Sequence, residues 1–165
     1  MIPWSQRSSE ERALLSPCFC SIILWHAAVG YTAQDGENLS FEEAFLILPL
    51  VLHAGLRSSL PRDTRTSLPV WLSRYPLAPA TIADRARSLA PFVKEGILFG
   101  SNYGVLELSH GRLQANEDIG GQVRSYLGRS SGEVQTCARR AGFVGRWFAH
   151  TGNAVTVFAT LGVRP

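Results

Sequence analysis

Histidines and cysteines are the side chains of this sequence that could bind a metal ion or act as nucleophiles. The chain has four histidines, which are spread along its length: His26, His53, His110 and His150. None of them is paired with a second histidine or a carboxylate at metal-ligand spacing on one predicted helix face. Cys18 and Cys20 are too close in sequence for a usual disulfide framework, and they lack the second ligand pair that zinc needs. We therefore expect no metal site.

A nucleophilic cysteine is the second kind of site that the sequence raises. Cys18 follows Pro17 at a predicted helix start, where the pKa of a thiol can be lowered, so a small thiol enzyme is one hypothesis. Core packing is the stronger interpretation for Cys18 and for Cys137, which lies on an apolar helical stripe. Lys94 has no glycine-rich phosphate loop before it, and no pair of carboxylates suggests acid–base catalysis. We expect no catalytic residues and no cofactor.

Length, composition and charge are those of a single folded domain. The 165 residues are 45% hydrophobic and 18% charged, which is ordinary for a globular protein and too apolar for a disordered one. A net charge of +3 permits contact with an anionic surface but falls short of a dedicated nucleic-acid binder. The apolar stretch at residues 45–52 is much shorter than the about 20 residues of a membrane-spanning helix. We expect a cytoplasmic protein with reduced cysteines and no membrane contact.

The elements that would position these side chains are mostly helices. Residues 16–17, a serine and a proline, form a good helix start, and we expect that first helix to end near Gly30. Ser40 and Glu43 form a capping box for the next helix. Pro49 removes an amide donor from that helix, so we expect a kink there.

Three later helix boundaries are expected from the same kinds of signal. Thr81 and Asp84 are expected to cap one helix. Pro91 is expected to restart that helix rather than to lie inside it. Ser130 and Glu133 form a further capping box before the C-terminal helices.

The segment at residues 104–116 reads as two short strands around a tight turn at residues 109–112. Helical pieces followed by such a hairpin occur in this order in a winged helix. We therefore predict a mainly α fold with a short β-hairpin, in which a winged-helix-like core is followed by C-terminal helices. The predicted parts are an N-terminal arm, this core, a connector and the C-terminal helices, at residues 1–15, 16–115, 116–132 and 133–165.

Arginines and aromatic side chains are the candidates for contact with other proteins, because tryptophan and arginine are enriched at interface anchors. Arg57, Arg62 and Arg65 cluster around one loop, which is either solvated or holds an acidic or phosphate partner. Trp147 and Phe148 are adjacent on a helix, where positions diverge by about 100°, so both are not expected to face inward equally. Packing in the core remains an equal alternative for these two. The candidate partner-binding residues are Arg57, Arg62, Arg65, Arg146, Trp147, Phe148, Arg164 and Pro165.

Five segments together resemble one protein family: SPCFCSIILWHAAVGY, FLILPLVLHAGLRSSLP, SLPVWLSRYP, DRARSLAPFVKEGILFGSNYGVLEL and GRWFAHTGNAVTVFATLGVRP. The chain resembles the middle component of bacterial three-component ABC-ATPase conflict systems, and is similar to the small subunit of Lamassu-type SMC-like anti-phage and anti-plasmid defence. The resemblance spans nearly the whole chain after the N-terminal arm. Its central motif matches Pro49, Leu50, His53, Arg57, Leu60 and Pro61, and its terminal motif matches Gly145, Arg146, Trp147, Phe148, Gly162, Val163, Arg164 and Pro165. Ser16 stands where asparagine is expected, a change that keeps a capping side chain.

The resemblance implies a subunit without enzymatic activity that joins an SMC- or Rad50-like ABC ATPase to an effector, often a nuclease. Such a subunit helps to keep the effector inactive until foreign DNA is sensed, and it meets DNA mainly through the complex. Within the central motif, Pro49, His53 and Pro61 are expected to have a structural role.

A winged-helix DNA-binding regulator is the alternative function. Arg85, Arg87 and the hairpin near Arg112 would then follow a DNA duplex. The modest net charge of +3 disfavours this alternative.

Overall fold

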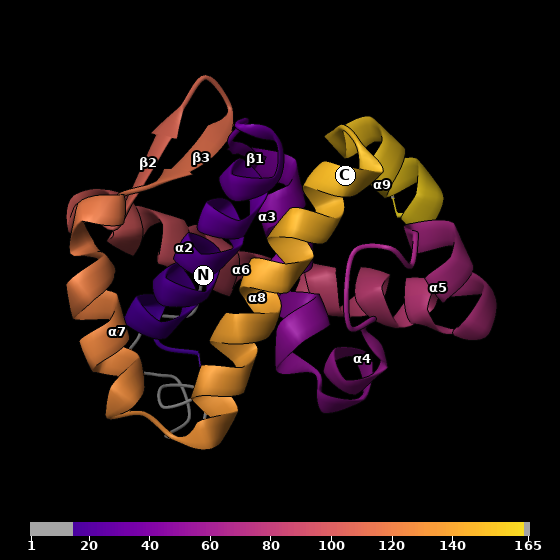
Figure 1. The fold of residues 1–165 in the computed structure, drawn as a ribbon, viewed down its shortest axis with the longest axis horizontal. Coiled ribbons are helices and arrows are strands. Elements are labelled where there is room, and N and C mark those ends of the chain that lie inside the picture. Colours follow the sequence, from indigo (N-terminus) through magenta and orange to yellow (C-terminus); the bar gives the residue numbers. More distant parts are fainter. Residues whose placement is uncertain (1–14, 164–165) are drawn as a thin grey trace.

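The computed structural model describes residues 15–163, which form a helical body with one small antiparallel sheet (Figure 1). The helices are α2 (Pro17–Asp35), α3 (Phe41–Leu52), α4 (Ala54–Ser59), α5 (Leu68–Arg74), α6 (Ala78–Asn102), α7 (Gly120–Gly128), α8 (Gly132–Thr151) and α9 (Ala154–Leu161). The strands are β1 (Leu39–Ser40), β2 (Leu106–Ser109) and β3 (Arg112–Ala115), and a 3-10 turn, η2 (Glu117–Ile119), precedes α7. The mainly α fold with a short hairpin is confirmed. The predicted arm at residues 1–15, apart from its last residue, lies outside the described residues, as do Arg164 and Pro165.

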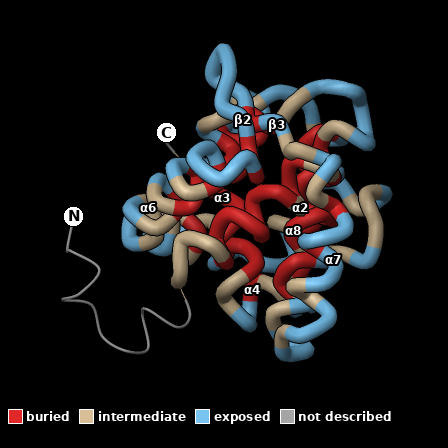
Figure 2. The backbone as a smooth tube through the Cα atoms, turned by 90° about the vertical axis from the view of Figure 1, so that its left-hand side faces the viewer, coloured by how far each residue is buried: buried red, intermediate tan, exposed pale blue. Residues whose placement is uncertain are grey.

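Helices α2 and α8 pack against each other at the centre of the molecule (Figure 1). Glycines allow this close approach. A Cβ atom on Gly145 would collide with the carbonyl oxygen of Ala27, and one on Gly30 would collide with the backbone of Gly142. Helix α2 is consequently buried along most of its length (Figure 2), and the core forms around it.

The prediction that the first helix ends near Gly30 is wrong. Helix α2 runs on to Asp35 and ends at Gly36, which has a φ of 80° and donates its N–H to the carbonyl oxygen of Thr32. The left-handed backbone at Gly36 is one that glycine adopts without steric cost. Gly30 is instead a contact point with α8, so its role depends on tertiary packing rather than on a helix stop.

The capping box at the start of α3 is confirmed. The Oγ atom of Ser40 accepts a hydrogen bond from the amide of Glu43 at 3.1 Å, and Oε2 of Glu43 accepts one from the amide of Ser40 at 3.3 Å. Pro49 lies inside α3, which ends at Leu52. His53 then adopts an extended backbone, with φ −81° and ψ 114°, and a separate short helix, α4, follows it.

Helix α6 is longer than the sequence indicated, and two of its predicted boundaries are wrong. It begins at Ala78, with Pro79 in its first turn, and it continues through Pro91. Thr81 does not cap it, because the Thr81 hydroxyl donates a hydrogen bond back to the carbonyl oxygen of Leu77 at 3.2 Å. Pro91 is exposed, so water can bond to the backbone carbonyl that loses its helical partner.

The predicted connector at residues 116–132 contains η2 and α7 rather than irregular chain alone. Among the contacts that hold it on the core, the indole N–H of Trp25 donates to the carbonyl oxygen of Asn116 at 2.7 Å, and Val123 is buried. The next helix, α8, is capped by Ser131 instead of Ser130, since Oγ of Ser131 accepts from the amide of Val134.

The predicted hairpin is confirmed as β2 and β3, and β1 adds a third strand. The strand order is β1-β3-β2, with Leu39 opposite Leu113 and Leu106 opposite Ala115. His110 and Gly111 form the turn with φ values of 51° and 73°, which suits a two-residue hairpin. The order helix, strand, helices and hairpin, with the first strand paired to the last, is compatible with a winged helix.

None of the helices within residues 15–163 has the length and apolar character to cross a membrane. The apolar helix α3 instead packs against the rest of the chain: its side chains from Leu46 to Val51 are buried, and those of Phe41, Phe45 and Leu52 are partly buried.

The α2–α8 contact predicts that Gly145→Ala destabilises the protein strongly. The added Cβ meets backbone, which cannot rotate away, so we expect the free energy of unfolding to fall by about 3 kcal/mol. Urea denaturation measures this change. The matched control is Gly121→Ala on the exposed side of α7, where a Cβ meets nothing within 4 Å and a small gain in helix stability is expected. Equal effects of the two substitutions would contradict the close contact.

Candidate interaction site

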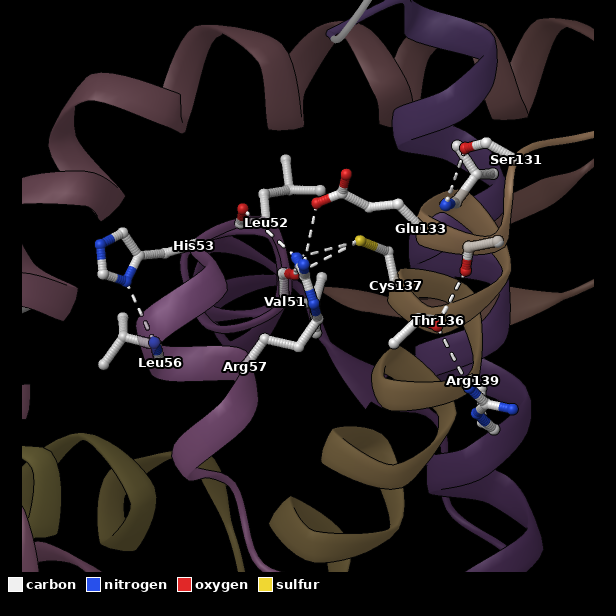
Figure 3. A network of polar contacts seen from close by, with 12 residues as sticks. Val51, Leu52, His53, Leu56, Arg57, Ser131, Glu133, Thr136, Cys137 and Arg139 are labelled. Carbon is white, nitrogen blue, oxygen red and sulfur yellow. Dashed lines mark hydrogen bonds and ion pairs between the residues drawn. The ribbon is translucent and has the colours of Figure 1, made fainter.

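Arg57, a predicted partner-binding residue, is held inside a network of polar contacts (Figure 3). Its Nη1 atom donates to the carbonyl oxygen of Val51 at 2.7 Å and contacts Sγ of Cys137 at 3.3 Å, and its Nη2 atom lies 2.9 Å from Oε1 of Glu133. The last carbonyls of a helix lack partners in that helix and attract cations. Arg57 therefore caps α3 and ties α4 to α8, and only 13% of its side chain is exposed.

The loop after α4 carries the other two predicted arginines, Arg62 and Arg65, and both are exposed. Arg65 forms an ion pair with Asp63 at 2.6 Å, although its side chain is 89% exposed. The guanidinium of Arg140 holds the start of the loop, because Nη2 donates to the carbonyl oxygen of Pro61 at 2.9 Å. The structure thus fixes the loop backbone to α8 and leaves Arg62 and Arg65 at the surface.

Trp147 and Phe148 are both completely buried, so the expectation that the two cannot both face inward is wrong. Trp147 stacks on Phe143 and meets Trp71 edge-on, with ring centroids 5.7 and 5.5 Å away, and its indole N–H donates to the carbonyl oxygen of Thr66 at 2.8 Å. Helix α8 has neighbours on more than one side, since α2, α3 and α9 all contact it. Neither side chain presents surface to a partner in this structure, whereas Arg146 is exposed.

His53, predicted to be structural, caps helix α4. Its Nδ1 atom accepts a hydrogen bond from the amide of Leu56 at 3.1 Å, which requires an unprotonated Nδ1 (Figure 3). Burial lowers the pKa of His53, and the charges of Arg85 and Arg57 lower it further. The imidazole is therefore held in its neutral form.

Two of the cysteines have thiol pKa values above the ordinary value. Burial raises the pKa of the Cys18 thiol, which is the opposite of the lowering that the helix start suggested. Burial also raises the pKa of Cys137, and the charge of Arg57 opposes this shift. Across residues 15–163, no group of three histidine, cysteine or acidic side chains is placed to hold a metal ion.

The surface feature nearest the predicted motif is a hollow between α4, α5 and α6, which we call the α4–α6 hollow. It has a volume of about 460 Å³, and its lining includes His53, Arg74, Tyr75 and Leu77. Leu77 is 79% exposed and Tyr75 is 42% exposed, so two apolar side chains lie at the surface beside the hollow. Neither Tyr75 nor Leu77 is among the residues that the sequence predicted to bind a partner. The position of Leu77 between Pro76 and Pro79, outside any predicted helix face, is the sequence signal that could have indicated its exposure.

Arg57, which is mostly enclosed, and Arg65, which is exposed, are expected to differ in how much they stabilise the fold. Arg57→Ala removes a charged donor from the carbonyl oxygens of α3, so we expect the free energy of unfolding to fall by about 2 kcal/mol. Arg65→Ala is the control of the same residue type, and no measurable change is expected because the pair with Asp63 is exposed. Chemical denaturation of both variants tests this. A larger loss for Arg65→Ala would show that the capping role of Arg57 is misassigned.

The capping role of His53 predicts a pH dependence of stability. With its folded pKa below the ordinary value of 6.5, the unfolded chain binds the proton more readily, so stability falls as the pH drops below about 6.5. His53→Asn keeps a capping oxygen but does not titrate. Thermal unfolding at pH 7.5 and 5.5 should therefore show a smaller decrease for His53→Asn than for the wild type. An equal decrease would exclude His53 as a source of the pH dependence.

Comparison with known proteins gives one clear result. No curated protein and no solved structure matches this chain. The family model of ABC-three component (ABC-3C) system Middle Component 3 matches residues 4–165, which is almost the entire chain. The chain therefore belongs to the Middle Component 3 family of ABC-three component systems.

Proposed function

We propose that this chain is a non-catalytic bridging subunit that links the ABC ATPase of its system to an effector. Membership of a middle-component family supports an assembly role, because a middle component works with the other parts of a three-component system. The observation that carries the proposal is the exposure of Leu77 and Tyr75 beside the α4–α6 hollow. Covering these two side chains with a partner removes apolar surface from water and so gains free energy.

The surface around Leu77 has the composition of an interface centre. An apolar chain and an aromatic ring stand next to a hollow, with the cation Arg74 in its lining. Burying a fully exposed leucine contributes about 1.5–3 kcal/mol, which corresponds to at least a tenfold change in affinity. Arginine and tyrosine are among the residues enriched at energetic hot spots, so this surface suits a stable protein contact.

The finer form of the proposal follows the family resemblance. The ATPase is of the SMC- or Rad50-like kind, the effector is a nuclease, and this subunit helps to keep the effector inactive until foreign DNA is sensed. Contact with DNA is then made mainly through the complex. The system works in the cytoplasm as an anti-phage or anti-plasmid defence of the Lamassu type.

Co-expression with the ATPase and effector encoded by neighbouring genes tests the bridging role. We expect one stable complex, and Leu77→Ser should lower the affinity of the α4–α6 hollow for its partner about tenfold, because the exposed apolar group is lost. Leu98→Ser is the matched control, since Leu98 is also exposed on α6, at 60%, but does not line the hollow. Purification through a tag on this chain shows whether the complex forms, and titration calorimetry measures the affinity of each variant for the partner.

A monodisperse chain that binds neither neighbouring protein would exclude the bridging role. If Leu77→Ser and Leu98→Ser weaken assembly equally, the contact does not lie at the α4–α6 hollow. The unfolding curves of both variants are compared with that of the wild type first, so that a loss of binding is not caused by a loss of folding.

A DNA-binding regulator remains the second candidate, and the strand order β1-β3-β2 is the observation that favours it. In this arrangement α6 precedes the hairpin, as a recognition helix precedes its wing, and Arg85 and Arg87 are exposed on it. The same purified chain discriminates the two candidates. Binding of free duplex with a steep dependence on salt, without binding of the ATPase, would favour the regulator.

A further inference from the structure

A second hollow lies where the end of α2, the start of α3, the hairpin turn and the start of α9 meet. Its volume is about 940 Å³, and it shares no lining residue with the α4–α6 hollow. Four carboxylates line it: Asp35, Glu37, Glu42 and Glu43. Arg112 is the single guanidinium among its described lining residues. This second hollow, here the acidic hollow, therefore contrasts with the net charge of +3 of the whole chain.

The positive charge of Arg112 is already engaged. Its Nη1 atom donates to the carbonyl oxygen of Asn38 at 2.7 Å and lies 3.8 Å from Oε2 of Glu37. One guanidinium that is shared in this way does not neutralise the carboxylates around it. The acidic hollow therefore has an excess of acceptors over donors.

Glu43 is the lining residue with an unmet hydrogen bond. Its side chain is completely buried, and Oε2 is used by the capping box with Ser40. Oε1 is also buried, yet no described residue donates a hydrogen bond to it. Leaving a buried carboxylate oxygen unpaired is costly, and a glutamine would close the same capping box without burying an ionisable group. The capping role thus accounts for only one of the two oxygens.

The electrostatics of the acidic hollow agree with this geometry. Burial raises the pKa of Glu43, whereas hydrogen bonding with Ser40, the charge of Arg112 and the neighbouring hydroxyl of Tyr31 act in the opposite direction. Burial raises the pKa of Tyr31 to about 12, with further contributions from the charges of Glu43 and Asp35. A cation placed here would relieve the excess of negative charge.

The wall formed by α9 is apolar. Val155 is 77% exposed at the start of that helix, and Phe158 and Val163 also line the acidic hollow. An occupant that satisfies both walls carries a cationic head beside an apolar group. A metal ion lacks the apolar part, and no group of three potential metal ligands occurs in the part of the chain that the structure describes.

We propose that the acidic hollow binds a lysine or arginine side chain, next to an apolar residue, that is presented by a partner subunit. The cation enters between the neighbouring carboxylates, and the side chains that cover the buried Oε1 of Glu43 move apart for it to bind there, while the apolar residue packs on Val155 of α9. Arginine fits best, because its planar guanidinium can bond two acceptors at once. The site rests on the proposed bridging function for the identity of its partner, but its ligand chemistry can be tested on the chain alone.

The first test is an NMR titration of the isolated chain at pH 7.5 with the blocked dipeptide N-acetyl-Leu-Arg-amide. Its neutral counterpart, in which citrulline replaces arginine, has almost the same shape and lacks the charge. We expect the arginine dipeptide to shift the amide resonances of residues around Glu43 and Tyr31, and the citrulline dipeptide to shift them little. Glu43→Gln should weaken this binding about tenfold, because a charged hydrogen bond becomes a neutral one.

Glu107→Gln is the matched control, because Glu107 is exposed on β2 and does not line the acidic hollow. Glu43→Gln retains the acceptor that closes the capping box, and an unchanged amide spectrum away from the acidic hollow confirms its fold. Equal binding of both dipeptides, or equal affinities of Glu43→Gln and the wild type, would overturn the proposal. Binding that appears only after deletion of Arg164 and Pro165 would also overturn it, since the chain's own tail would then be the occupant.

The second test separates this inference from the bridging function. In the co-expressed complex, Glu43→Gln should weaken the attachment of one partner, and Glu107→Gln should not. If the wild-type complex forms and Glu43→Gln leaves it intact, with no binding of the arginine dipeptide, the inference fails while the bridging role stands. If no complex forms with the wild type, the bridging role fails and the dipeptide titration alone decides whether the cation site exists.

Discussion

The close contact between α2 and α8 is the constraint on which the rest of the structure depends. Gly30 and Gly145 bring the two backbones together at distances that any side chain would prevent. Helix α8 is thereby drawn into the body, where α3 and α9 also contact it. A helix enclosed on several sides has little face left for solvent, and this is why adjacent large residues such as Trp147 and Phe148 are both buried.

Enclosure of α8 also explains why several residues with interface chemistry are used internally. The region between α3 and α5 has backbone carbonyls without a partner inside a helix, and two buried indoles and one half-buried guanidinium donate to them. Trp71 bonds to Ser59, Trp147 to Thr66 and Arg140 to Pro61. Tryptophan and arginine are favoured at interfaces because they combine a large apolar body with a directional donor, and the same property suits a loop that must be fixed to a core.

Some features with a local cause could be predicted from the sequence, although the caps expected at Thr81 and Ser130 were not found, and features that depend on distant neighbours could not be predicted. The capping box of Ser40 and the turn at His110 and Gly111 follow from residues close in sequence, and both are present. Gly30 was predicted to end the first helix because glycine often does so. Its actual role, close contact with α8, involves a residue more than a hundred positions later in the sequence. Pro91 looked like a boundary, although its place on the exposed side of α6 makes the lost hydrogen bond tolerable. The α4–α6 hollow was missed for the same reason, since its lining comes from three helices.

A residue with a satisfactory local explanation can have a second role that only its tertiary neighbours show. Glu43 completes a capping box, and from the sequence nothing more is required of it. In the fold it places an unpaired oxygen against the acidic hollow, apart from the apolar surface around Leu77. Apolar burial supplies affinity with little selectivity, whereas a buried charge rejects partners that lack its complement. For the bridging role that we propose, surfaces of both kinds are an advantage, because neither partner then competes for the site of the other.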